Sequence, residues 1–388
     1  MEQKTALTAA EMCADCNNEV TRGKPEACPG KSLSPRPGNG HLPAMLKHLP
    51  IALAVTLVVL TSSATNAADH APTAGRITTA VEKSLPLLTA GARGSMEKRE
   101  RCFTCHNQGL PIMALATAQS RGFQIDVEEL AKQVKFTADF LDKNRTNYLA
   151  GKGQGGQADT AGYALWALEN GGWKPNPTTA AVTEYLLRWQ TDLVHWRPQS
   201  RRPPTEQSLF TSTHAALRGL TTYGTTEQRD RIAQRTAQVR EWLLKTPAQD
   251  TEDRVFRLRA LHVASAPAVD IQKAAKELLE TQRADGGWEQ LTGMATDAYA
   301  TSTALVALHQ VGGLATSDAA YQQGLRYLLG KQLPDGSWLV TSRSRPIQSY
   351  YESGYPHGTN QFISISAASW STTALALALP EVPAVTRR

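Results

Sequence analysis

The chain has 388 residues, of which 41% are hydrophobic and 20% are charged, and its formal net charge is +6. These values are typical of a globular protein and exclude a disordered chain or a membrane protein. The basic residues are scattered, and the densest cluster, Arg197 to Arg202, is short and lies in a Pro-rich stretch. We therefore predict a solvated loop there and no nucleic-acid partner.

The first 67 residues read as a leader. Residues 45–67 place Lys47 before a short apolar core, with Thr65 and Ala67 where a signal peptidase requires small residues. The core is shorter than the roughly 20 apolar residues that a membrane span needs, so we predict a signal peptide, a periplasmic protein and no transmembrane anchor after cleavage. Residues 1–44 are either an atypical, disordered leader or precede a true start at Met45. The folded domain is expected over residues 68–388.

Only two cysteines remain after such a leader is removed. Cys13, Cys16 and Cys28 fall within it, whereas Cys102 and Cys105 form the motif Cys-Phe-Thr-Cys-His, which ends at His106. In this spacing two thiols can add to haem vinyl groups while the histidine binds the iron. We therefore predict covalent haem c, with electron transfer to a redox partner protein or redox chemistry.

Other interpretations of this motif stay open. Cys102 and Cys105 could form a redox disulfide, with His106 lowering a thiol pKa. The three residues could also bind zinc with a distant fourth ligand, or His106 could simply begin a helix. A separate cytochrome c domain is not expected, because Met113 is too close to serve as a distal ligand and the next methionine is Met294.

Two kinds of helix alternate along the rest of the chain. Six small, apolar segments share an x-Ala-Leu pattern and should be buried all round. They are centred on Ala114, Ala167, Gly219, Ala260, Ala307 and Ala376. Longer charged segments, such as 127–144 and 227–246, lie between them. Six inner helices alternating with about six outer helices predict a closed, all-α barrel of the α/α type.

Three further segments repeat without gaps, at 185–196, 277–288 and 327–338. Each has a Leu-Leu pair, then a glutamine, then a tryptophan six residues later; the pairs are Gln190 and Trp196, Gln282 and Trp288, and Gln332 and Trp338. We predict an amphipathic helix that ends in a turn, with the glutamine bonded to the chain end and the tryptophan folded back over it. A glycine before the last two tryptophans permits the positive φ that such a turn needs.

These repeats resemble the QW motifs of the terpenoid cyclase and protein prenyltransferase superfamily, most closely those of squalene–hopene cyclases, over roughly residues 80–380. The resemblance implies an α/α toroid, with six inner and about six outer helices around an apolar central cavity. Cys102, Cys105, His106, Arg121-Gly122 and Pro356-His357-Gly358 also resemble an exported bacterial branch with an embedded CxxCH.

The reactions of this superfamily are not expected to carry over. Residues 159–168 are similar to the end of the cyclase acid motif. Alanine, at Ala158, occupies the position of the aspartate that donates the proton in that motif. We predict that Asp159 is a helix N-cap. Asp297 stands where the prenyltransferases have a zinc-binding aspartate, but Tyr299 replaces the cysteine ligand. No zinc is therefore expected, no catalytic residue is assigned, and whether the chain is an enzyme stays undecided.

Parallel inner helices would gather their N-termini at one rim of the ring. The predicted rim residues are His106, Asp159, His214, Asp297, Tyr299, Tyr355 and His357. Helix N-termini there favour an anionic group such as a haem propionate or a phosphate. Because the loop at 341–362 would neighbour the first repeat, we predict His357 as a distal iron ligand or a gate; a polar turn residue is the alternative.

Two other functions remain in competition with the haem protein. One is an isoprenoid- or lipid-binding protein, or a diverged cyclase, that holds a hydrophobic small molecule in its cavity without haem. The other is a protein-interaction scaffold.

Overall fold

The computed structural model describes residues 72–346 and 349–382, which belong to one unit. The predicted leader (1–44) and signal peptide (45–67) lie outside the described residues. The described helices include none that is both long and apolar enough to cross a bilayer.

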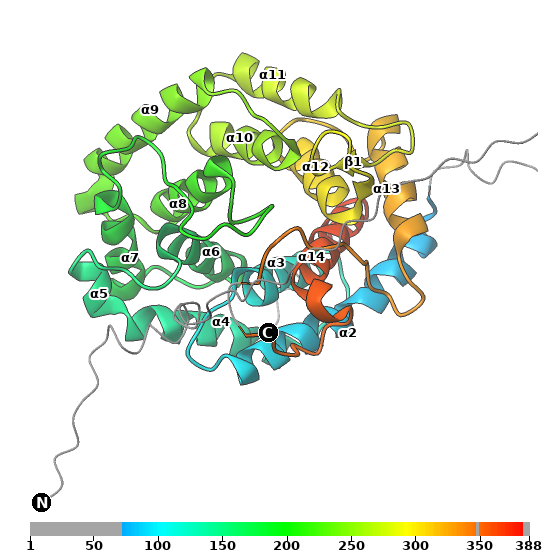
Figure 1. Ribbon diagram of the computed structural model, residues 1–388, viewed down its shortest axis with the longest axis horizontal. Coiled ribbons are helices and arrows are strands. Elements are labelled where there is room, and N and C mark those ends of the chain that lie inside the picture. Colours follow the sequence, from blue (N-terminus) through cyan, green and yellow to red (C-terminus); the bar gives the residue numbers. More distant parts are fainter. Residues whose placement is uncertain (1–71, 347–348, 383–388) are drawn as a thin grey trace, which may run out of the picture. The chain divides into compact units, whose positions relative to one another are not determined.

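Six inner helices form a closed ring (Figure 1), in which each packs against the next and the last returns to the first. They are α3 (Leu110–Ser120), α6 (Gln157–Asn170), α8 (Leu209–Tyr223), α10 (Thr251–Val263), α12 (Ala298–Gln310) and α14 (Gln361–Leu377). All six x-Ala-Leu positions are buried in these helices, as predicted. Small residues allow close approach: a Cβ on Gly162 of α6 would lie 2.8 Å from a backbone carbon of Ala215 in α8.

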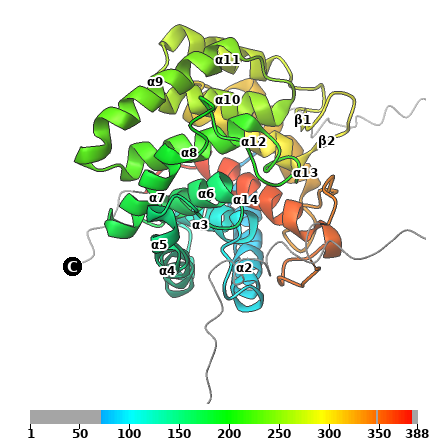
Figure 2. The same cartoon turned by 60° about the vertical axis from the view of Figure 1, so that its left-hand side comes forward.

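Charged helices surround this ring, as Figure 2 shows from the side. They are α2 (Ala74–Lys98), α4 (Val127–Lys143), α7 (Pro177–Arg188), α9 (Arg229–Lys245), α11 (Ala268–Leu279) and α13 (Ala319–Lys331). Shorter elements fill the connections: the π-helix η1 (Cys105–Gly109), α5 (Arg145–Leu149), the 3-10 turns η2 (Thr226–Gln228) and η3 (Gly358–Asn360), and the antiparallel strands β1 (Trp288–Glu289) and β2 (Thr296–Asp297). Inner and outer helices alternate, which confirms the predicted α/α toroid.

The three Gln-to-Trp segments have the predicted geometry. Each follows an outer helix, and each indole N–H donates to a carbonyl ten residues earlier, at distances of 3.1 Å for Trp196, 3.0 Å for Trp288 and 2.8 Å for Trp338. The tryptophan thus folds back over the last turn of its own helix and adds a hydrogen bond to one of the carbonyl groups there.

The glutamines of the last two segments also join neighbouring outer helices. Gln282 Nε2 donates to the carbonyl oxygen of Ala320 in α13, at 2.8 Å. Gln332 Nε2 donates to the carbonyl oxygen of Ala80 in α2, at 2.8 Å, and so closes the outer ring between its last and first helices. Gln190 departs from this pattern, because its side chain accepts from the backbone N–H of Arg197.

Aromatic side chains meet in the middle of the ring. Trp166 of α6 lies 5.8 Å from Trp370 of α14 between ring centroids, and Phe256 of α10 packs on Trp370 at 6.4 Å. The guanidinium of Arg259 lies over both indoles, at 5.5 Å and 5.4 Å. The aromatic side chains in the middle of the ring therefore pack around the buried guanidinium of Arg259.

Candidate functional site

A chain of buried hydrogen bonds joins the first turns of four inner helices. Ser212 of α8 donates to Asp159 of α6. One residue earlier, Thr211 Oγ1 donates to Glu252 Oε1 of α10, at 2.8 Å. Tyr299 of α12 donates its hydroxyl to Glu252 Oε2, at 2.9 Å. The helix N-termini therefore meet at one rim, which we call the N-terminal rim.

Asp159 is not the helix N-cap that its position predicted. The N-cap of α6 is Gly156, and Asp159 lies two positions into the helix. Its carboxylate accepts from Ser212 and from the backbone N–H of Gln199, at 3.2 Å, so it ties α6 to α8 and to the following loop. Burial and the nearby Glu206 raise its pKa from 3.8 to about 7.

Glu252 is a rim residue that the sequence analysis missed. Its carboxyl is 5% exposed and contacts only hydroxyl donors, and burial raises its pKa from 4.5 to about 8. The signal was present in the sequence: an acidic cluster at 250–253 immediately precedes an x-Ala-Leu helix, as Asp159 and Tyr299 do.

A cavity of about 420 Å³ opens at this rim, and we call it the rim pocket. Its walls come from η1, from the loop before α8, from the loop at 341–360 and from the first turns of α14. Its lining residues are His106, Arg202, Pro203, Thr205, Glu206, Ser342, Ser344, Arg345, Pro346, Ser349, Tyr350, Thr359, Asn360, Phe362, Ile363 and Ser366. The wall of the rim pocket therefore contains both apolar and polar side chains.

An ion pair is built into one wall of the rim pocket. Arg202 donates to Glu206 Oε2 through Nε at 2.8 Å and through Nη2 at 2.6 Å, and Ser200 donates to the same carboxylate. Glu206 is 4% exposed. The predicted solvated loop at 197–202 is therefore wrong at Arg202, which turns inward because a buried carboxylate needs a cationic partner.

The CxxCH motif lies beside this pocket. The His106 imidazole is buried against Phe362 of α14, with ring centroids 5.1 Å apart, and its Nε2 has no hydrogen-bond partner among the described residues. Burial, together with Arg202 and Arg99, lowers the His106 pKa to about 3, so the ring is neutral and one nitrogen carries a free lone pair.

Cys105 carries a free thiol that is buried in the core, so the structure does not join it to Cys102. Burial, with Glu206 and Asp159 nearby, raises the Cys105 pKa well above its usual value. The alternative in which His106 activates a thiol is therefore wrong for Cys105. Among the described residues no group of three or more His, Cys, Asp or Glu side chains could hold a metal ion.

The remaining predicted rim residues lie apart from the rim pocket. Asp297 caps α12 by accepting from Ala300 N at 2.9 Å, and it also accepts from Gln290. His214 is deeper in the ring, packed edge-on against Trp166.

The long loop before α14 holds two more predicted rim residues, Tyr355 and His357. Tyr355 is buried against α2, where a Cβ on Gly91 would lie 3.0 Å from it. His357 Nε2 is 2.8 Å from Ser337 Oγ in the last Gln-to-Trp turn. His106 lines the rim pocket, and His357 is not among its lining residues.

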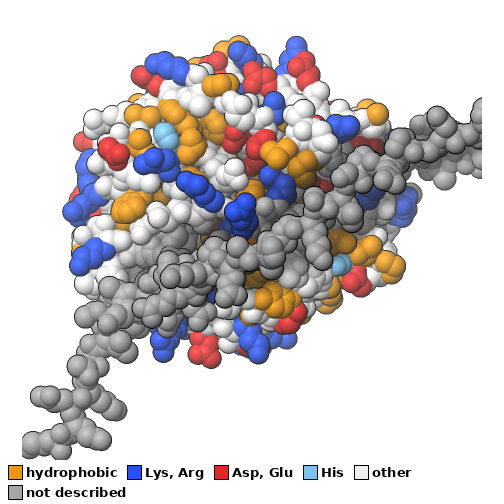
Figure 3. Space-filling view, viewed as in Figure 1, with side chains coloured by type: hydrophobic (Ala, Val, Ile, Leu, Met, Phe, Trp, Pro, Cys, Tyr) orange, Lys and Arg blue, Asp and Glu red, His pale blue; other side chains and the backbone are white. Residues whose placement is uncertain are grey.

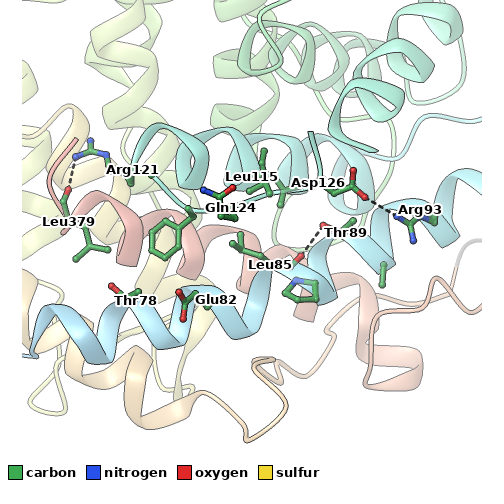
Figure 4. Close-up of a pocket in the computed structure, with 15 residues that line it drawn as sticks. Thr78, Glu82, Leu85, Thr89, Arg93, Leu115, Arg121, Gln124, Asp126 and Leu379 are labelled. Atoms are coloured by element: carbon green, nitrogen blue, oxygen red, sulfur yellow. Dashed lines mark hydrogen bonds and ion pairs between the residues drawn. The ribbon is translucent and has the colours of Figure 1, made fainter. Parts of the chain in front are cut away.

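A second, larger cavity of about 580 Å³ lies outside the ring, between α2 and the turn that joins α3 to α4 (Figure 4). Leu85 and Leu115 contribute to its apolar floor. At one end Arg121 donates to the carbonyl oxygen of Leu379, at 2.7 Å. At the other, Arg93 pairs with Asp126 at 3.5 Å. We call this cavity the outer groove.

Comparisons with known proteins agree with the fold. No family model matches the chain. A stretch of 108 residues is 34% identical to the lanosterol synthase of Candida albicans, covering 28% of this chain and 14% of that relative's length.

Solved structures are similar at the level of the fold. A glycosidase variant has 13% identity and a TM-score of 0.51, over 77% of this chain and 98% of its own. A variant of the type II terpene cyclase MstE from Scytonema, in complex with geranylgeranyl dihydroxybenzoate, has 15% identity and a TM-score of 0.50, over 79% and 98%. The comparisons therefore confirm the all-α toroid, and one local stretch of the chain is similar to a lanosterol synthase.

Proposed function

We propose that this chain binds an isoprenoid-like amphiphile in the rim pocket, as a diverged member of a terpenoid cyclase-like superfamily. The observation that carries the proposal is the composition of the pocket wall. Phe362, Ile363 and two prolines offer an apolar surface, while Arg202, Glu206 and several hydroxyls face it. Such a wall suits a ligand with an apolar chain and one polar end. The similarity to a cyclase whose structure holds a geranylgeranyl compound adds support.

Binding is proposed rather than alkene protonation. Ala158 occupies the position of the acid and is fully buried. The Asp159 carboxyl is neutral below about pH 7, but it is engaged by Ser212 and is not among the residues that line the rim pocket in the described part of the chain. A general acid has to reach the atom that it protonates.

Isothermal titration of the full chain with geranylgeraniol tests this proposal. Ile363→Trp would fill the pocket and abolish binding, whereas Val269→Trp, on the exposed face of α11, would leave it unchanged and serves as the matched control. Absence of binding to wild type would overturn the proposal. Equal binding to both variants would overturn the assignment to the rim pocket and direct attention to the outer groove.

Covalent haem c is the second candidate, and one observation favours it: the buried, unpartnered Nε2 of His106 at the pocket wall. A neutral imidazole with a free lone pair suits an iron ligand. His106 would hold the iron, and the free thiol of Cys105 would carry one thioether link; Cys102, which is disulfide-bonded in this structure, would have to be reduced before it could carry the second. When bound, haem would supply one-electron chemistry. A protein that carries it would need a redox partner protein and would be exported, because covalent attachment takes place outside the cytoplasm.

Haem staining of a denaturing gel, after expression in a host that matures cytochromes c, tests this candidate. A stained band that disappears in the double variant Cys102→Ser, Cys105→Ser would support it. A colourless wild-type band of full length would reject it and leave the binding proposal intact.

A further inference from the structure

The two arginines of the rim pocket differ in what they can offer a ligand. Arg202 is engaged by Glu206 through two of its nitrogens. Arg345 is exposed, and no carboxylate of the described residues lies within ion-pair distance of it. Arg345 is therefore the pocket cation that is available to an incoming group.

Hydrogen bonds fix the segment that carries Arg345 against the rest of the pocket. Ser344 Oγ donates to the carbonyl oxygen of Pro203, at 3.0 Å, which ties it to the loop that holds Arg202. The backbone N–H of Ser342 donates to Asn360 Oδ1, at 2.9 Å, which ties it to the turn before α14. These two hydrogen bonds thus hold the segment that carries Arg345 at the pocket.

The charge around the pocket favours an anion. Among the Arg, Lys, Asp and Glu side chains that line the pocket, Arg202 and Glu206 neutralise each other, and Arg345 contributes one unpaired positive charge. Exposed Arg197 and Arg201 extend the positive charge along the neighbouring loop, and Figure 3 shows several Lys and Arg side chains gathered near the middle of the face in view. Unpaired cations around a mouth attract anionic ligands over several ångströms.

We infer that Arg345 selects ligands whose polar end is an anionic oxygen group, a carboxylate or a phosphate, with the apolar chain lying along Phe362 and Ile363. This inference rests on the proposed function and specifies the ligand class of the same pocket. A guanidinium donates two parallel hydrogen bonds to such a group, whereas a neutral alcohol receives only one.

Titration of the full chain with three probes of one chain length separates the possibilities: farnesol, farnesoate and farnesyl monophosphate. Wild type is expected to bind the anionic probes about tenfold more tightly than farnesol at low salt, because a charge-assisted hydrogen bond contributes more than a neutral one. Comparison of farnesoate with the monophosphate distinguishes a carboxylate from a phosphate.

Arg345→Gln should bring the anionic probes to the affinity of farnesol and leave farnesol unchanged. Arg345→Glu should instead favour farnesylamine. Arg145→Gln, on the exposed surface of α5 and outside the pocket lining, is the matched control and should keep the tenfold preference. Equal affinity of wild type for farnesol and farnesoate, or a preference that survives Arg345→Gln, would overturn the inference while the binding proposal stands. Failure of every probe to bind would reject the proposed function itself.

Discussion

Replacing Glu252 with glutamine should stabilise the protein at high pH and change little at low pH. Glutamine keeps the shape of the side chain, and its amide can still accept from Thr211 or Tyr299 and donate to the other. What it removes is a buried group that ionises. Comparison of the variant with wild type therefore measures how much free energy it costs to bury an ionised carboxylate at the N-terminal rim.

The direction in which stability changes with pH follows from the direction of the Glu252 pKa shift. In the unfolded chain Glu252 ionises near pH 4.5, whereas in the folded protein it holds its proton until about pH 8. Between these values the folded state binds more protons than the unfolded state, so the free energy of unfolding falls as the pH rises. The full shift corresponds to about 5 kcal/mol, an upper bound reached above pH 8.

Urea unfolding at pH 5 and pH 9 measures this difference directly. Relative to wild type, Glu252→Gln should gain stability from pH 5 to pH 9, by as much as about 5 kcal/mol. Glu280→Gln, at the exposed C-cap that follows α11, is the control and should show no such change. A stability difference between Glu252→Gln and wild type that is the same at both pH values would refute the reasoning. Asp159 shifts stability with the same sign, but it is present in both proteins and cancels.

Three further changes test the repeat turns and the last loop. Trp338→Phe removes the indole N–H bond to the Leu328 carbonyl, which keeps its bond from the Gln332 backbone N–H, so chemical denaturation should show a loss of about 0.5–1.5 kcal/mol. Gly336→Ala places a Cβ at φ +93° and 2.5 Å from the carbonyl oxygen of Lys83, and thermal unfolding should register a loss of about 1–3 kcal/mol; an unchanged midpoint would contradict the steric argument. His357→Ala should cost about 1 kcal/mol through the lost bond to Ser337 and, in a protein that carries haem, leave the visible spectrum unchanged; a spectral shift would instead put His357 near the iron.

The repeat pattern of the sequence was sufficient to predict the ring, because each repeat builds the same local structure. The tryptophan bonds its own helix ten residues back, and the spacing of Trp196, Trp288 and Trp338 from their Leu-Leu pairs encodes that contact. Six small apolar segments can be buried together only if their helices close on one another. The local periodicity of the sequence was therefore enough to predict how the helices are arranged.

The rim pocket was harder to predict because its parts come from loops that share no spacing. Arg202 and Glu206 lie in an irregular segment, and only the buried position of Glu206 explains why Arg202 turns inward. His106 was found through a short motif, but its neighbour Phe362 lies more than 250 residues away. The position of Asp159 was predicted correctly at the rim, whereas its bonding was not, because Ser212 belongs to another repeat.

The order of the helices has a consequence for synthesis on the ribosome. α14, which is buried over nearly its whole length, packs between α12 and α3 and is translated after all the other inner helices. Until it emerges, the nascent chain is an open arc whose first and last inner faces have no partner. Exposed apolar surface of this kind promotes aggregation and chaperone binding. We expect nascent chains arrested before residue 361 to depend on chaperones, and release of the final segment to be the event that completes the core.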